Sequence, residues 1–188
     1  MPRAFAHPLL LCIGALCSCQ PIGLAADISD EPAPACPAPK VEQTDWRSVE
    51  LVRIGVRLKM PKKYAEKHWD ISVGEPIVAT FRAGHLEQFT LELDSPAGLP
   101  LTDQKVGRQS SYERYTECAD TISGHEAIIQ SFREPHVIFM DNRWYRGFAV
   151  HAVCDLRPGR ILRFDGSAAT RQGQEELLAI VRTLEFTL

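Results

Sequence analysis

Apolar and polar residues alternate in several runs after residue 50, with the two-residue period of a half-buried β-strand. The first run ends at Pro61, and its apolar positions are Val52, Ile54, Val56, Leu58 and Met60. Residues 75–84 and 88–94 form a second pair of runs on either side of Ala83-Gly84-His85. Because glycine suits the reversed backbone of a tight turn, these two runs predict an antiparallel hairpin.

The second half of the chain predicts a series of strands joined by tight turns. Two of these turns are marked by Ser123-Gly124-His125 and by Asp141-Asn142. The strand-like runs around and after them are residues 114–122, 126–134, 137–140, 143–156 and 160–166. Strands that follow one another through short turns pair antiparallel, so the pattern predicts a mainly antiparallel sheet.

Residues 169–184 change to the period of a helix, with apolar positions at i, i+3, i+4 and i+7. The resulting apolar stripe comprises Leu177, Ile180, Val181 and Leu184. Thr170 or Ser167 is suited to cap the N-terminus of this helix. We therefore expect an α+β domain, a mainly antiparallel β-sheet with a C-terminal amphipathic helix packed on one face.

Residues 1–18 predict an export signal. An arginine near the start precedes an apolar stretch at 9–16 that is too short to span a bilayer. The following Leu16-Cys17-Ser18-Cys19 resembles the lipobox of bacterial lipoproteins, in which a leucine and a small residue precede the modified cysteine. The resemblance implies cleavage before Cys19, acylation of its sulfur and its amine, and, from Gln20, sorting to the outer membrane.

Two other interpretations of this segment stay open. Cleavage after Ala25-Ala26 would release a soluble periplasmic or secreted protein, and an uncleaved segment would act as an anchor itself. We expect the lipid anchor on Cys19, with the protein on the outer membrane facing the periplasm, because the lipobox-like residues directly follow the apolar stretch.

A proline-rich tether separates the signal from the domain. Residues 19–45 hold five of the 13 prolines, and alternating prolines favour the extended polyproline II conformation. We therefore expect a signal peptide at 1–18, a tether at 19–45 and one domain at 46–188. Within that domain residues 95–111 show no period, and a loop of this length is either functional or poorly fixed.

The domain resembles the PsbP-like and DcrB-like domains. The likeness is carried by the opening strand that ends at Pro61, by Tyr115-Thr116-Glu117-Cys118, and by the closing run from Glu176 to Phe186. It covers most of residues 50–188. The resemblance implies antiparallel strands covered by helices, and a non-enzymatic envelope or accessory role.

The composition excludes several classes of protein. The 188 residues are 45% apolar and 24% charged, which is typical of a globular chain and not of a disordered one. With 21 Lys and Arg against 24 Asp and Glu, the net charge is −3. Because dedicated nucleic-acid binders carry a basic excess, we expect no nucleic-acid partner.

The mature chain holds three cysteines besides the lipidated one, namely Cys36, Cys118 and Cys154. Cys118 and Cys154 lie in strand-like runs, and in an oxidising envelope we expect a disulfide between them. Cys36 on the tether has no evident partner. The alternative is two buried free thiols, whereas a reactive Cys118 beside His125 or His151 would indicate a small thiol-dependent hydrolase.

No run of residues has the spacing of a metal or cofactor site, so we expect no metal and no cofactor. The sequence predicts a lipid-anchored or exported envelope protein that binds another molecule rather than catalysing its conversion. Its partners would be the membrane, through the anchor, and an envelope protein, with the exposed sheet face or residues 95–111 as contact surfaces. The thiol-dependent hydrolase and a purely structural module of an envelope assembly are the alternatives.

Overall fold

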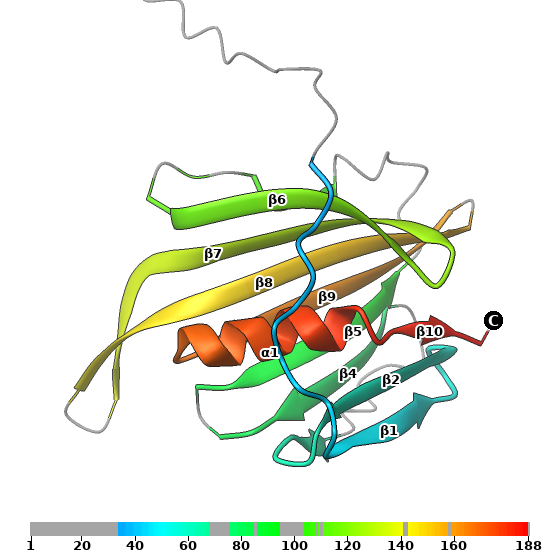
Figure 1. The fold of residues 1–188 in the computed structure, drawn as a ribbon, viewed down its shortest axis with the longest axis horizontal. Coiled ribbons are helices and arrows are strands. Elements are labelled where there is room, and N and C mark those ends of the chain that lie inside the picture. Colours follow the sequence, from blue (N-terminus) through cyan, green and yellow to red (C-terminus); the bar gives the residue numbers. More distant parts are fainter. Residues whose placement is uncertain are drawn as a thin grey trace, which may run out of the picture. The chain divides into compact units, whose positions relative to one another are not determined.

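The computed structural model describes residues 34–67, 76–84, 86–94, 104–107, 109, 111–140, 143–157 and 159–187. These residues belong to one unit, Pro32–Leu188, whose ribbon is drawn in Figure 1. The predicted signal peptide, Cys19 and the tether up to residue 33 lie outside the described residues.

Within this part of the chain the strands form two sheets, and every strand pair is antiparallel. The smaller sheet has the order β1 (Trp46–Leu51), β2 (Val56–Pro61), β10 (Glu185–Phe186). The larger sheet has the order β3 (Ala65–Lys67), β4 (Ile77–Arg82), β5 (Gln88–Asp94), β9 (Arg160–Ala168), β8 (Arg143–Arg157), β7 (His125–Met140), β6 (Glu113–Ile122). The helix α1 (Arg171–Val181) follows β9. The expected α+β class is confirmed.

One face of the larger sheet, here called the inner face, is covered by α1 and by the smaller sheet (Figure 1). Their contact makes the hydrophobic core. The largest fully buried side chains include Phe81, Phe89 and Phe164 from the larger sheet, Leu58 and Met60 from β2, and Leu177 and Ile180 from α1. The opposite face of the larger sheet is called the outer face.

The helix begins as the sequence predicts. The side chain of Thr170, rather than that of Ser167, caps α1, because its Oγ1 accepts a hydrogen bond from the backbone N–H of Gly173 at 3.0 Å. The predicted apolar stripe is buried in full. Among the described residues, no helix has the length and apolar character required to cross a membrane.

The first predicted strand is only half right. The alternation from residue 52 to 60 suggested one strand, but residues 52–55 form a turn between β1 and β2. Gly55 has a φ of 72°, and its N–H donates to the carbonyl of Leu51 at 2.8 Å. Val52 is consequently 80% exposed instead of facing the core. The alternation runs through the turn by coincidence, so it could not reveal the break.

Two predicted strands are one continuous strand. Residues 126–134 and 137–140 both belong to β7, which pairs with β8 along its length. The register shifts between Arg133 and Val137, where β7 carries extra residues that include Pro135. Because proline has no N–H to donate to the ladder, it is tolerated at such a bulge.

The end of the predicted tether is part of the domain. Cys36 is bonded to Cys118 on β6, and Ala35 pairs with Ala119 in a short parallel bridge. The N–H of Cys36 donates to the carbonyl of Ala119 at 3.3 Å. The unit therefore begins at Pro32, ahead of the expected boundary at residue 46.

The predicted disulfide between Cys118 and Cys154 is wrong. Cys118 is opposite Ile129 of β7, and Cys154 is opposite Ala127 of the same strand. Because β7 lies between the strands of these two cysteines, they are separated by two strand spacings of about 4.8 Å each. A disulfide requires Cα atoms within about 7 Å. Cys154 is a buried free thiol instead.

Candidate functional site

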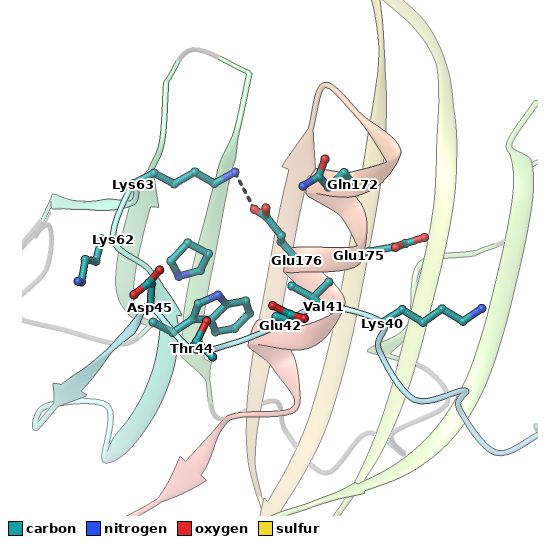
Figure 2. Close-up of a pocket in the computed structure, with 12 residues that line it drawn as sticks. Lys40, Val41, Glu42, Thr44, Asp45, Lys62, Lys63, Gln172, Glu175 and Glu176 are labelled. Carbon is teal, nitrogen blue, oxygen red and sulfur yellow. Dashed lines mark ion pairs between the residues drawn. The ribbon is translucent and has the colours of Figure 1, made fainter.

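A groove of about 580 Å³ lies between α1, the end of β2 and the segment that leads into β1 (Figure 2). Three stretches distant in sequence line it: residues 40–46, residues 61–63 and the first half of α1. The helix contributes Gln172, Glu175 and Glu176, which share one face because they are spaced three and four residues apart. The groove therefore exists only in the folded chain.

Lys63 and Glu176 join two walls of the groove. Figure 2 shows their side chains reaching toward each other, and the Nζ of Lys63 lies 2.6 Å from Glu176 and 2.9 Å from Glu87. Burial opposes the charge of Lys63, but the two carboxylates outweigh it, so the pKa of Lys63 is raised. Lys63 is therefore held charged and in place.

Tyr64 lies behind Lys63 and is fully buried. The Nζ of Lys63 is 5.5 Å from the centre of its ring, and Phe89 packs edge-on against it at 5.3 Å. Burial, followed by the charges of Glu87 and Glu176, raises the pKa of the phenol. Tyr64 thus stays neutral and connects the groove to the core.

The remaining charged residues of the groove are solvent-facing. Lys40 and Lys62 lie at opposite ends of it in Figure 2. Glu42 and Asp45 lie between them in sequence, together with the half-buried Trp46. The lining thus offers both signs of charge beside an aromatic surface. The described residues that line it include no cysteine, serine or histidine, so this described lining supplies neither a thiol or serine nucleophile nor an imidazole base.

A second polar cluster lies on the outer face, around the fully buried Gln130. Its side-chain oxygen accepts from the N–H of Val106 at 2.9 Å, and its Nε2 donates to the carbonyl of Val106 at 3.0 Å. Nε2 also lies 2.6 Å from the hydroxyl of Tyr115 and 3.0 Å from Glu117. Gln130 therefore fixes residue 106 of the long loop to the sheet.

Glu117 completes this cluster. Burial opposes its ionisation, but hydrogen bonds from Lys105, Tyr115 and Gln130 outweigh that effect and lower the pKa of the carboxyl. The Nζ of Lys105 lies 2.7 Å from Glu117. Lys105, like Val106, belongs to the long loop, so the loop is held by both a charge pair and hydrogen bonds.

Arg163 on β9 holds the same loop from the other side. Its guanidinium donates to Gln104 at 2.6 Å, to Asp94 at 2.7 Å and to Glu92 at 2.9 Å. From the sequence, the exposed sheet face and residues 95–111 are expected as two alternative contact surfaces. Residues 104–106 instead lie on the outer face, so in the described part of the loop the two are one surface.

The residues of the thiol-hydrolase alternative are not brought together. Cys118 is in a disulfide, and Cys154 is buried, which raises the pKa of its thiol to about 12. His151 is on the outer face, where its Nδ1 lies 2.5 Å from Asp165. The Nδ1 of His125 donates to the carbonyl of Asp155, near the C-terminal end of β8, at 3.0 Å. Among the described residues, no three metal-binding side chains gather at one point.

Sequence reasoning missed both polar sites. Gln130 had a signal, because it is a polar residue inside the apolar run of β7 (Ala127 to Phe132). No sequence signal marked the groove, because Trp46, Lys63 and Glu176 come from three separate parts of the chain. Their proximity depends on how α1 packs against the smaller sheet.

The sequence matches no known protein-family model and no curated protein. Its fold is similar to the solution structure of cyanobacterial PsbP (CyanoP) from Synechocystis sp. PCC 6803, with a TM-score of 0.53 and 12% identity over 80% of this chain and 98% of that one. A crystal structure from Bacteroides thetaiotaomicron VPI-5482 aligns with a TM-score of 0.41 and 11% identity, over 70% of this chain and 45% of that one.

The domain therefore has a PsbP-like fold, an antiparallel sheet covered on one face by a helix. Of the resemblance stated from Pro61, the Tyr115–Cys118 segment and the closing helix, the PsbP-like part is confirmed at the level of fold. At 12% identity the likeness carries no residue-by-residue role. Any function must be argued from the sites of this chain.

Proposed function

We propose that this protein is an exported accessory protein, held to the outer membrane by a lipid on Cys19, which binds an extended segment of an envelope protein in the groove. One observation carries the proposal. The residues that continue the tether are fixed to the sheet by the Cys36–Cys118 disulfide and then form a wall of the groove.

The chemistry of the groove defines the segment that would fit. Lys40 and Lys62 favour acidic residues, Glu42 and Asp45 favour basic ones, and Trp46 offers a surface for an apolar side chain. Tryptophan is among the residues that contribute most to protein–protein binding. The proposed ligand is thus a protein segment that carries both signs of charge around an apolar residue.

Export is supported by two independent features. The leader has the order of a signal peptide and a lipobox-like end at Cys19, and the chain contains a disulfide, which forms and persists in oxidising compartments. The PsbP-like fold agrees with the accessory role that the resemblance implies. A soluble exported form, cleaved after Ala25-Ala26, is the competing hypothesis for the anchor.

The anchor is tested by the mass of the protein purified from its own envelope. We expect a chain that begins at Cys19, carries the added mass of its acyl chains, and gains two protons on reduction of one disulfide. The Cys19→Ala variant should leave the membrane fraction. A mature chain that begins after Ala26 without acyl groups would overturn the anchor and leave the groove hypothesis to its own test.

The groove is tested by placing a photoreactive amino acid at Lys62, which is exposed and lines it. The matched control carries the same amino acid at Val52, which is 80% exposed and lies outside the groove. We expect a discrete adduct from position 62 in intact cells, and none from position 52. The adduct should weaken in the Cys36→Ser variant, because that change releases the groove wall. Equal adducts from positions 62 and 52, or none from 62, would contradict the proposal.

A further inference from the structure

One wall of the groove is tied to the rest of the protein at its two ends. Residues 37–45, here called the strap, run past α1 toward β1 (Figure 1). Before the strap, Cys36 is bonded to Cys118 on β6, and after it Trp46 begins β1. Within the described ranges, the strap makes one hydrogen bond, in which the carbonyl of Gln43 accepts from the N–H of Trp46 at 3.2 Å. The strap is therefore fixed at its ends and not along its length.

The other walls of the groove are held firmly. Lys63 lies between the carboxylates of Glu87 and Glu176, at 2.9 and 2.6 Å, and the adjacent Tyr64 is fully buried. The helix α1 is fixed through its buried apolar stripe. A change in the shape of the groove therefore has to come from the strap.

The Cys36 end of the strap depends on its disulfide. The N–H of Ala119 donates to the carbonyl of Pro34 at 2.9 Å, and the N–H of Cys36 donates to the carbonyl of Ala119 at 3.3 Å. In the part of the chain that the structure describes, these two are the backbone hydrogen bonds between this end and β6. The flanking residues 34, 35, 37 and 38 are exposed, so they contribute little apolar burial. Without the disulfide, this end would be the weakest attachment of the groove wall.

The core does not depend on the strap. The buried residues of the core cluster lie between Leu51 and Leu184, and Cys36 only packs against them as a half-buried side chain. Cys154 is a free thiol inside that core, separated from Cys118 by β7. The Cys36–Cys118 bond can therefore open while the core stays formed, and without exchange onto Cys154.

We propose that reduction of the Cys36–Cys118 bond releases the strap and lowers the affinity of the groove, a regulation that rests on the proposed function. The reductant is an envelope dithiol of the thiol–disulfide oxidoreductase class. Its thiolate attacks the Sγ of Cys36, the S–S bond breaks, and Cys118 leaves as a thiolate that takes up a proton. The second thiol of the reductant loses its proton and attacks the mixed disulfide, which closes the reductant's own disulfide and returns Cys36 as a thiol. Two electrons thereby pass from the reductant to the protein.

Release of the strap should weaken binding because the strap carries part of the groove. Lys40, Glu42 and Asp45 belong to it, and the walls that remain carry Lys62 and Glu175. With the strap fixed, these groups are already in place when a ligand arrives. Once the strap is released, the ligand has to order it on binding, and this ordering lowers the affinity. The oxidised protein is thus the binding form.

The release is tested without any ligand, on the protein purified from its own envelope. Hydrogen exchange is followed before and after dithiothreitol, and a gain of two protons in mass verifies the reduction. We expect the amides of Cys36 and Ala119 to exchange at least roughly tenfold faster after reduction, while that of Phe89 in the core stays far slower than either. The matched control is Cys36→Ser, which should show the fast exchange with and without dithiothreitol.

The effect on binding is tested with the photoreactive amino acid at Lys62, in isolated envelopes. We expect its discrete adduct to weaken at least roughly fivefold after dithiothreitol and to return after oxidation by oxidised glutathione. Cys154→Ser should respond as the wild type does, because its thiol takes no part. Cys36→Ser should give the same weak adduct in both conditions. A further loss of adduct in Cys36→Ser on reduction would assign the effect to the partner and overturn the inference.

Three other results would also overturn it. Unchanged exchange at Cys36 and Ala119 after verified reduction would show that other contacts hold the strap. Equal exchange at Cys36 and Phe89 in the reduced protein would show that the bond holds the whole fold. A Lys62 adduct that persists after release of the strap would leave a groove that binds without this regulation. Absence of the adduct in both states would instead remove the proposed function itself, so the two failures are distinguishable.

Discussion

On the inner face of the larger sheet Phe81, Phe89 and Phe164 stack in a row, with ring centres 4.7 and 5.1 Å apart. On the outer face Gln130 and Arg163 instead hold a loop by hydrogen bonds and charge pairs. The two faces therefore contribute different properties. The inner face is stabilised by apolar burial, which depends little on pH or salt, whereas the outer face holds residues 104–106 through interactions that depend on protonation.

The largest expected effect is on the inner face. Phe89→Ala removes a ring that is fully buried and stacked on both sides, so we expect a loss of about 3–5 kcal/mol in the free energy of unfolding. The neighbouring Thr90 is on the outer face, and Thr90→Ala should cost under about 1 kcal/mol because the hydrogen bond described for its hydroxyl is a single one, with Thr80 at 3.3 Å. Denaturation by urea measures both. Equal losses would refute the contrast between the faces.

A smaller effect is expected from Gln130→Met, which keeps the volume of the side chain but removes its amide. The N–H and carbonyl of Val106 then lose their partners, at a cost of about 1–3 kcal/mol. The distinctive signature is local. Hydrogen exchange at the amide of Val106 should accelerate while that of Phe89 in the core changes only in proportion to global stability. Unchanged protection at Val106 would show that other contacts hold the loop.

Acid should loosen the outer face before the inner one. Since the pKa of Glu117 in the folded protein lies below its ordinary value of 4.5, its ionised form stabilises the fold. This contribution is fully present above pH 4.5 and is lost as the pH falls through the lowered pKa of the folded state. Comparison of wild type with Glu117→Gln from pH 7 downward should give two stability curves that converge in acid. Parallel curves would contradict the assignment.

The smallest effect is expected for Cys154, which should not react with thiol reagents in the native protein. It is 1% exposed, and burial raises the pKa of its thiol from 9.0 to about 12. At pH 8 this lowers the thiolate fraction by ~1000-fold, so a thiol reagent should leave it unlabelled in the native protein. Labelling should appear only on unfolding, and should be absent in Cys154→Ser. Rapid labelling of the native chain would mean that the inner face opens at this strand.

The sequence predicted the inner face well and the outer face poorly, for a physical reason. Burial of one face imposes a two-residue alternation, which is visible in Phe89, Leu91 and Leu93 without knowledge of any neighbour. The turn at Gly55 was not predicted, because the alternation of apolar and polar residues continues through it. The contacts of Gln130 and Arg163 depend on where a loop folds back, which no local pattern records.

The prediction of the disulfide was wrong for a related reason. Cys118 and Cys154 were both recognised as strand residues, but the sequence does not state how many strands lie between them. A prediction that assumes adjacent strands is wrong as soon as β7 intervenes. Cys36 was overlooked because it lies in a proline-rich stretch, where composition predicts a free tether.

The Cys36–Cys118 bond also bears on how the chain avoids aggregation. β6 is an outermost strand of its sheet, and exposed strand edges recruit other chains into shared sheets. The backbone of residues 34–36 occupies part of this edge, donating to and accepting from Ala119, and the disulfide keeps it there. Without the disulfide, the backbone hydrogen bonds described between this segment and β6 are the two with Ala119. A reduced chain would therefore hold this segment less firmly and leave more of the β6 edge open to pairing with another chain.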